Sequence, residues 1–265
     1  MKYQKAIFFD IDGTIIDSCG HIPPSAVQAI HAARQAGAAC MVNTGRPFSH
    51  VDPAVRAIGF DGYICSCGQH ILLDGETIFR QGFSPDLRQE IADAARQCRM
   101  DVVYEAEEGI WFDLFHPPLP VITDTKIQFA RRGFDVEHST HAPDFTFDKL
   151  CAFPQPDSDT PRFLALLEPH CTVIRREGGM LEIIRKGCSK EEGVRWAVRH
   201  LRLSLRQCFA IGDSTNDLPM LNCVPHSIAM GGAPDEVKAA AEYVTADLHD
   251  DGLARALDHY RLTAP

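Results

Sequence analysis

The chain of 265 residues carries 36 Asp and Glu against 26 Lys and Arg, a formal charge of −10, with 45% hydrophobic and 23% charged residues. This composition is that of a folded globular protein, and its acidic balance argues against a nucleic-acid partner, whose phosphates attract clustered Lys and Arg. No apolar run approaches the ~18 residues of a membrane span, and acidic side chains follow the N-terminus too closely for a secretory signal. We therefore expect a cytoplasmic protein with no membrane partner, in which the ten scattered cysteines stay reduced.

The first 65 residues alternate apolar runs with helical patterns. The apolar runs are short and continuous, as strands buried on both faces of a parallel sheet are. Gly37 stands where a helix typically ends, just after a helical pattern. Strands separated by helices in this way predict right-handed βαβ units and a doubly wound sheet. The expected strands are residues 6–9, 38–42 and 62–65, and the expected helices are one with Val27, Ile30 and Ala33 on one face and one within residues 48–58.

The pattern changes after residue 70. Two apolar runs flank Asp74-Gly75, which is a hairpin signal. Further on, strand-like pieces, helical patterns and three prolines (117, 118 and 120) predict a separate α+β unit. Its expected elements are helices at 86–98 and near 162–167, strands at 102–104 and 110–112, and a pair of strands, 173–174 and 181–184, around Gly178-Gly179.

The α/β alternation returns after residue 188. Ser189-Lys190-Glu191-Glu192 has the form of a capping box, in which serine and glutamate satisfy the first free amides of a helix. The sequence therefore predicts an α/β fold with a doubly wound, Rossmann-like parallel-sheet core, residues 1–82 and 188–265, and an inserted α+β domain, residues 83–187. The last expected elements are helices at 190–201, 217–223 and 235–242 and strands at 208–211 and 227–230.

Acidic residues follow two of the predicted core strands. They stand two apart in Asp10-Ile11-Asp12-Gly13-Thr14, and four apart in Gly212-Asp213-Ser214-Thr215-Asn216-Asp217. Open α/β sheets place their sites at the carboxyl ends of strands, where such carboxylates can converge on Mg²⁺ or divide into nucleophile and acid/base. An Asp-rich turn or an aspartate N-cap accounts for either motif alone, but less well for two in one chain.

Two segments supply polar groups that could hold a phosphate group. Asn43-Thr44-Gly45-Arg46 follows the second strand and offers a hydroxyl, a glycine amide and a guanidinium. Lys190 begins a helix, where backbone amides and the helix dipole favour an anion. Each is an ordinary feature alone, a loop and a surface lysine. Together they would supply the positive surroundings that phosphoryl transfer needs.

These four segments stand in the order of the four motifs of the haloacid dehalogenase superfamily, which the chain resembles over essentially its whole length. The insertion is similar to the cap of the superfamily's Cof-type, class IIB, sugar-phosphatase-like branch. The tail, with Leu221, Ser227 to Gly231 and Pro234 to Lys238, resembles the run after the fourth motif there. One departure is Cys67-Gly68, where the branch commonly has Asn-Gly. We interpret it as a change in local packing or substrate fit.

The resemblance implies a Mg²⁺-dependent phosphatase for small phosphate monoesters, such as sugar phosphates or phosphorylated cofactors. Asp10 would be the nucleophile that forms an aspartyl-phosphate, and Asp12 the general acid and base. Mg²⁺ would bind the side chains of Asp10 and Asp213 and the main-chain carbonyl of Asp12, while Asp217 supports this set from behind, through water or Lys190. The phosphoryl oxygens would contact Thr44, Gly45, Arg46, Lys190 and Asn216.

The inserted domain is expected to set the substrate. Two alternatives stay open: a phosphotransferase or phosphomutase on the same core, and a catalytically weak regulatory protein that binds a metabolite. The expected partner is a small phosphorylated metabolite, and the expected state a monomer or a weak homo-oligomer. The candidate specificity residues, each also typical of a core or a solvated surface, are Trp111, Phe112, His116, Arg175, Arg176 and Met180.

Overall fold

The computed structural model describes residues 2–115 and 117–264, so that His116 lies outside the described residues. The chain divides into two compact units, a core (Met1–Arg80 with Ser189–Pro265) and a cap (Gln81–Cys188). None of the described helices has the length and the apolar run that crossing a bilayer needs. All ten cysteines are free thiols, and most are buried, as expected.

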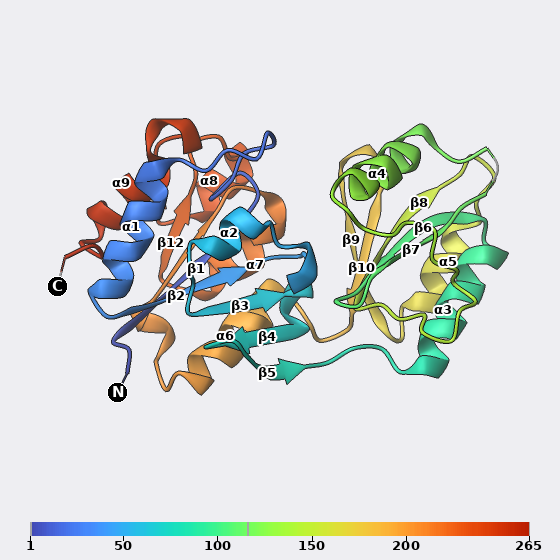
Figure 1. Cartoon of the computed structure of the whole chain (residues 1–265), viewed down its shortest axis with the longest axis horizontal. Helices are drawn as coiled ribbons and strands as arrows, with labels where there is room; N and C mark the ends of the chain where they lie inside the picture. Colours follow the sequence, from blue (N-terminus) through green and yellow to red (C-terminus); the bar gives the residue numbers. More distant parts are fainter. Residues whose placement is uncertain (1, 116, 265) are drawn as a thin grey trace. The chain divides into compact units, whose positions relative to one another are not determined.

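The core unit is built on a mixed, mostly parallel sheet (Figure 1). Its first strand lies in the middle and pairs in parallel with neighbours on both sides. The predicted hairpin around Asp74-Gly75 extends one edge with antiparallel strands. In the order in which they pair, the strands are β13 (Tyr243–Val244), β12 (His226–Ala229), β11 (Cys208–Gly212), β1 (Lys5–Phe9), β2 (Ala38–Asn43), β3 (Gly62–Cys65), β4 (His70–Leu73) and β5 (Glu76–Arg80).

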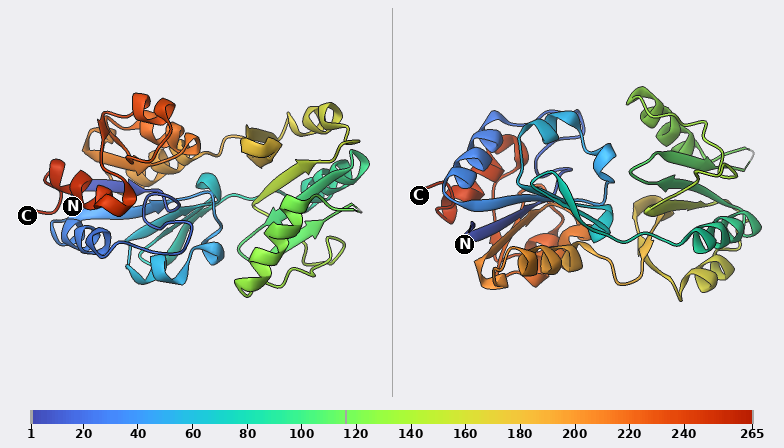
Figure 2. Two further views of the ribbon diagram at one scale, coloured as in Figure 1. Left: turned by 90° about the horizontal axis from the view of Figure 1, so that it is seen from above. Right: turned by 60° about the horizontal axis from the view of Figure 1, so that its bottom comes forward.

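Helices cover both faces of the core sheet (Figures 1 and 2). Successive side chains of a strand point to opposite faces, so Ile7 and Phe9 pack against one helical layer, and Ala6 and Phe8 against the other. This double burial explains why the core strands are continuous apolar runs. The first layer contains α1 (Pro24–Gln35), α2 (Pro53–Ala57) and α9 (Gly252–His259), and the second contains α6 (Lys190–His200), α7 (Leu218–Cys223) and α8 (Asp235–Ala240).

The cap unit has an antiparallel sheet with helices on both faces. One face packs against α3 (Pro85–Gln97) and α5 (Thr160–Leu167), and part of the other against α4 (Pro120–Arg131). This arrangement confirms the predicted α/β fold with a separate α+β unit. In order of pairing, the strands are β7 (Ile110–Asp113), β6 (Met100–Glu105), β8 (Lys149–Pro154), β10 (Leu181–Arg185) and β9 (Cys171–Arg175).

The structure differs from the expected elements in several places. The single helix expected within residues 48–58 is a 3₁₀ turn followed by the short α2, and the helix expected from residue 217 begins with another 3₁₀ turn. The sequence missed α4, β8, β13 and α9. The 3₁₀ turns are η1 (Phe48–His50), η2 (Ser66–Gly68), η3 (Glu177–Gly179), η4 (Leu205–Gln207), η5 (Thr215–Asp217) and η6 (Leu248–Asp250).

Candidate active site

The two acidic motifs meet at the carboxyl edge of the core sheet. β1 and β11 pair in parallel, with Phe9 opposite Ile211, so the residues that follow them emerge side by side. The amide of Asp10 continues this ladder by donating to the carbonyl of Ile211 at 3.0 Å. On its other side β1 pairs with β2, which ends at Asn43. The strand order reverses around β1, and such a point in an open α/β sheet is where ligands bind.

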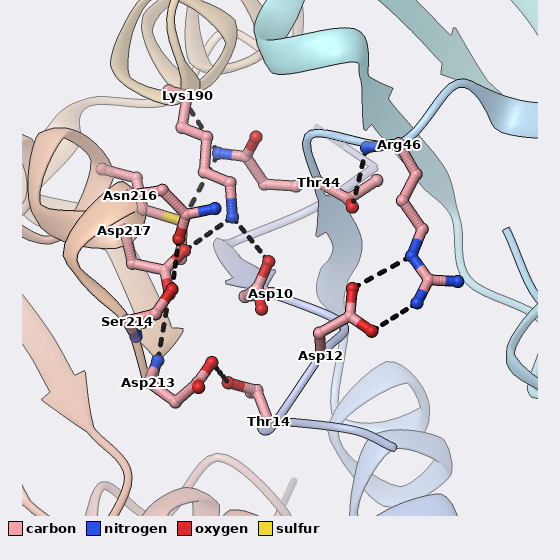
Figure 3. A network of polar contacts seen from close by, with 12 residues as sticks. Asp10, Asp12, Thr14, Thr44, Arg46, Lys190, Asp213, Ser214, Asn216 and Asp217 are labelled. Atoms are coloured by element: carbon pink, nitrogen blue, oxygen red, sulfur yellow. Dashed lines mark hydrogen bonds and ion pairs between the residues drawn. The ribbon is translucent and has the colours of Figure 1, made fainter. Parts of the chain in front are cut away.

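A buried lysine joins the carboxylates (Figure 3). Lys190 is 3% exposed, and its ammonium donates to Asp10 Oδ1 at 2.5 Å and to Asp217 Oδ1 at 2.6 Å. The other oxygen of Asp217 accepts from the amides of Asp213 and Ser214, each at 3.0 Å. Both oxygens of Asp217 therefore accept hydrogen bonds from the chain itself, and Oδ1 of Asp10 shares the Lys190 ammonium with it.

The charges of this cluster do not balance within the described residues. Three carboxylates, those of Asp10, Asp213 and Asp217, lie with donor oxygens within 4.8 Å of one another around a single ammonium. Burial, together with the neighbouring Asp217, raises the pKa of Asp10 well above its usual range and that of Asp213 to about 6. Burial alone would lower the pKa of Lys190, but Asp10 and Asp217 outweigh it and raise that pKa.

The turn after β1 is shaped around Asp213. Gly13 has φ +78°, which is strained for any other residue, and a Cβ there would lie 2.3 Å from Asp213 Oδ2 and displace that carboxylate. The hydroxyl of Thr14, fully buried, donates to Asp213 Oδ1 at 3.2 Å. Thr14 was part of the predicted motif without a role, and its contact with a residue 199 positions away has no signal in the sequence.

Asp12 and Arg46 form a separate ion pair at the rim of this site (Figure 3). The guanidinium of Arg46 donates hydrogen bonds to both oxygens of Asp12, from Nε to Oδ2 at 3.0 Å, and also to the carbonyl of His50. Unlike Asp10, Asp12 is exposed. The structure thus places the Arg46 guanidinium on Asp12. Its expected contact with a phosphoryl group stays a prediction.

β2 ends in a loop that is held by hydrogen bonds. Thr44 is buried, its backbone binds Ile64 and Cys67, and its hydroxyl accepts from the amide of Arg46 at 3.2 Å. Gly45 lies between Thr44 and Arg46, half-buried. Asn43, which opens the predicted motif but had no role assigned to it, is fully buried. It donates to the carbonyl of Lys190 at 3.0 Å and so links the end of β2 to the start of α6.

The N-terminus of α6 is fixed by close backbone packing. The Ser189 hydroxyl accepts from the amide of Glu192 at 3.0 Å, which confirms the serine half of the predicted capping box. Gly68 packs against this turn, since a Cβ there would lie 2.4 Å from the carbonyl of Ser189. Cys67, the departure from the family pattern, has φ +54° in the left-handed region, where Asn is better tolerated than Cys. The consequence is local strain beside the Lys190 turn.

Asn216 lies beside the cluster, half-buried, and its side-chain oxygen accepts from the Ser214 hydroxyl. The described specificity candidates of the cap fall into three groups. Trp111 belongs to the buried core of the cap, while Phe112 and Met180 pack beside its second apolar cluster. Arg176 binds Glu182, with Nε to Oε2 at 2.9 Å, and Arg175 is exposed.

The donor set at the core cluster suits a hard divalent cation. Asp10 and Asp213 offer carboxylate oxygens, which hard divalent cations prefer, and with Asp217 they make three carboxylates beside one ammonium. A divalent cation would supply the two charges that Lys190 leaves uncompensated. The residues therefore fit a metal in the class to which Mg²⁺ belongs.

A doubly wound core with acidic strand ends, a buried lysine at a helix start and an inserted α+β unit defines a haloacid dehalogenase-type hydrolase. The haloacid dehalogenase-like hydrolase family matches residues 7–257, and the chain belongs to that family. Within it, the chain is a Cof-type, subclass IIB phosphatase, and the family implies metal-dependent catalysis.

Relatives cover the chain almost end to end. A phosphoglycolate phosphatase of Methanoculleus marisnigri is 26% identical, over 97% of this chain and 96% of its own length. An HMP-PP phosphatase of Escherichia coli is 25% identical, over 95% and 92%. The structure of the subclass IIB sugar phosphatase BT4131 superposes with a TM-score of 0.79 at 26% identity, over 97% of this chain and 99% of that one.

Proposed function

We propose that this protein hydrolyses small phosphate monoesters, sugar phosphates or phosphorylated cofactors, through an aspartyl-phosphate on Asp10. The observation that carries the proposal is the Asp10 carboxylate, buried at a strand end with one oxygen held by Lys190. A carboxylate held in this way can attack phosphorus in line, which splits one hard displacement into two steps. The names of the relatives support the reaction, and their differing substrates leave the particular ester open.

The remaining residues follow from their positions. Asp12 would protonate the leaving oxygen and then deprotonate the attacking water, with Arg46 keeping its carboxylate oriented. Lys190, Thr44, the Gly45 amide and Asn216 would hold the phosphoryl oxygens. Mg²⁺, bound by Asp10, Asp213 and the main-chain carbonyl of Asp12, would neutralise the repulsion between nucleophile and phosphate. Asp217 would hold Lys190 and the turn of Asp213 in place.

We assign the choice of leaving group to the cap. It contains a buried ionic group on one face of its sheet, in which Lys149 lies 3.1 Å from Glu182 and 3.4 Å from Glu105. Burial opposes ionisation of Glu182, but Lys149 and Arg176 lower its pKa to about 2. These opposite charges compensate one another inside the cap. A panel of phosphorylated metabolites, scored by released phosphate and by transfer to acceptor sugars, identifies the ester and separates hydrolysis from phosphotransfer.

The nucleophile is tested with Asp10→Asn. The amide is nearly isosteric but not nucleophilic, so we expect turnover of p-nitrophenyl phosphate with Mg²⁺ to fall by at least about 10³-fold while the fold is retained. Asp235→Asn, at an exposed position on α8, is the matched control and should keep full activity. Turnover within tenfold of the parent protein, with roughly the same circular dichroism spectrum, would remove Asp10 from this role.

A further inference from the structure

A second group of ligand-bearing side chains lies in the core unit, outside the cluster around Lys190. Asp17 and His21 stand in the loop that follows the proposed nucleophile, and His249 stands in η6, more than 220 positions further along the chain. One donor atom from each lies within 4.8 Å of the other two. The fold therefore brings two imidazoles and a carboxylate from distant segments to one place.

The carboxylate of this group is held in a fixed orientation. Asp17 Oδ1 accepts from the amides of Cys19 and His21, each at 2.8 Å. Its other oxygen, Oδ2, points to His249, with Nε2 3.5 Å away. The rings of His21 and His249 lie nearly parallel, 22° apart, with centroids separated by 6.1 Å. One oxygen and two rings thus converge, and the loop conformation is already set by backbone hydrogen bonds.

The chemistry of these donors differs from that of the Lys190 cluster. Two imidazoles and one carboxylate are a common ligand set for Zn²⁺ and for other borderline transition metals, whereas Mg²⁺ selects oxygen. Donors around one such ion at metal–ligand distances of about 2.1 Å lie about 3 to 3.5 Å apart. Both histidines are exposed, so their side chains can close the remaining distance without disturbing the core.

We propose that Asp17, His21 and His249 form a second metal site, selective for a transition-metal dication such as Zn²⁺ or Co²⁺. Water or a solute would complete the coordination. The site borders a cavity of about 440 Å³, whose lining includes Asp17 and His249 as well as Asp12 and Asp213. An ion there would tie the loop after β1 to η6 and place positive charge on the wall of an acidic cavity, which favours anionic ligands.

The test uses the untagged full chain with saturating Mg²⁺, so that the oxygen site is filled before Co²⁺ is added. We expect one equivalent of Co²⁺ to bind with a saturable visible absorption band, which Zn²⁺ then abolishes by displacement. His21→Gln and His249→Gln should each weaken Co²⁺ binding by at least roughly tenfold. His200→Gln, whose ring stacks on Trp196 elsewhere in the core, is the matched control and should bind as the parent does.

Two results would rule out the site. One is the absence of a saturable cobalt band, and the other is an equal affinity for Co²⁺ in the parent and both histidine variants. Loss of the band as Mg²⁺ is raised places the cobalt at Asp10 and Asp213 and also rules it out. None of these outcomes depends on phosphatase activity, so failure here is separate from failure of the proposed nucleophile.

Discussion

At the scale of single residues, the cluster of Asp10, Asp213, Asp217 and Lys190 is a compromise between stability and binding. Lys190 pairs with Asp10 and Asp217. Asp213 lies beside these carboxylates, and burial raises the pKa values of Asp10 and Asp213. Buried like charges destabilise the apoprotein, and the same charges create affinity for a cation. A stability cost located at the proposed metal ligands is expected for a site kept for function.

This compromise predicts the effect of Asp213→Asn in EDTA. The folded pKa of Asp213, about 6, lies above its unfolded value, so the stability it contributes is fully present below about pH 4 and is lost as pH rises through 6. The asparagine of the variant stays neutral, so the variant does not lose this stability as the pH rises. We therefore compare the free energy of unfolding of the variant minus that of the parent at two pH values. This difference should be about 2 kcal/mol larger at pH 7.5 than at pH 4.5.

Urea titrations across that pH range measure the difference, and Asp235→Asn, at an exposed position, is the control. A gap between variant and parent that does not change with pH would show that Asp213 ionises as freely in the folded protein as in the unfolded one. Added Mg²⁺ should stabilise the parent and leave Asp213→Asn nearly unchanged, because the variant loses a metal-binding oxygen.

The sequence predicts the location of most candidate site residues, because parallel strands place their carboxyl ends at one edge of the sheet. It does not predict the partner of a long side chain. Arg46 follows a strand next to β1 and can reach either a phosphate or Asp12, and only the folded backbone decides between them. Asn43 and Thr14 belong to predicted motifs, but their roles were not predicted because their contacts, with Lys190 and Asp213, join segments far apart in the sequence.

At the scale of elements, local signals predict the core better than the cap. Core strands buried on both faces stand out as apolar runs, whereas α4 begins at a proline within a proline-rich stretch and buries only Ile122. Proline favours the first turn of a helix as much as it interrupts a later one, so the stretch predicts either structure. β8 begins with a buried lysine, which is compatible with a strand only because Glu105 and Glu182 lie on the neighbouring strands.

The end of α6 offers a test at this scale. The amide of Leu203 donates to Val198 and that of Arg202 to Arg199, a Schellman arrangement whose left-handed residue is usually glycine. Here it is Arg202, with φ +58°. Arg202→Gly should relieve the strain and raise the free energy of unfolding by about 1 kcal/mol, or the melting temperature by about 2 to 4 °C.

Arg202→Ala separates the two contributions, since alanine removes the long side chain but keeps the penalty of the left-handed conformation. The melting temperatures of the parent, Arg202→Gly and Arg202→Ala, measured under one condition, separate the effect of the backbone from that of the side chain. An equal gain for alanine and glycine would assign the effect to the arginine side chain instead of the backbone.

At the scale of the whole molecule, the chain consists of two units with separate apolar cores. The clusters of the core unit draw on the sheet around β1, and those of the cap on the sheet around β8. The proposed Mg²⁺ ligands and the second histidine-containing site all belong to the core unit. A ligand stabilises the part of a protein whose folding its binding requires, so metal binding should act on one unit.

Hydrogen exchange followed by mass spectrometry tests this expectation. With Mg²⁺ at about 100 times its dissociation constant, amides of β1, β11 and the start of α6 should exchange up to about 100-fold more slowly, corresponding to about 2.7 kcal/mol. Amides of β6, β8 and β10 in the cap should keep their rates. Asp213→Asn should abolish the slowing in the core, because it removes a proposed ligand. Equal slowing in both units would instead show that core and cap unfold as one cooperative body, despite their separate apolar clusters.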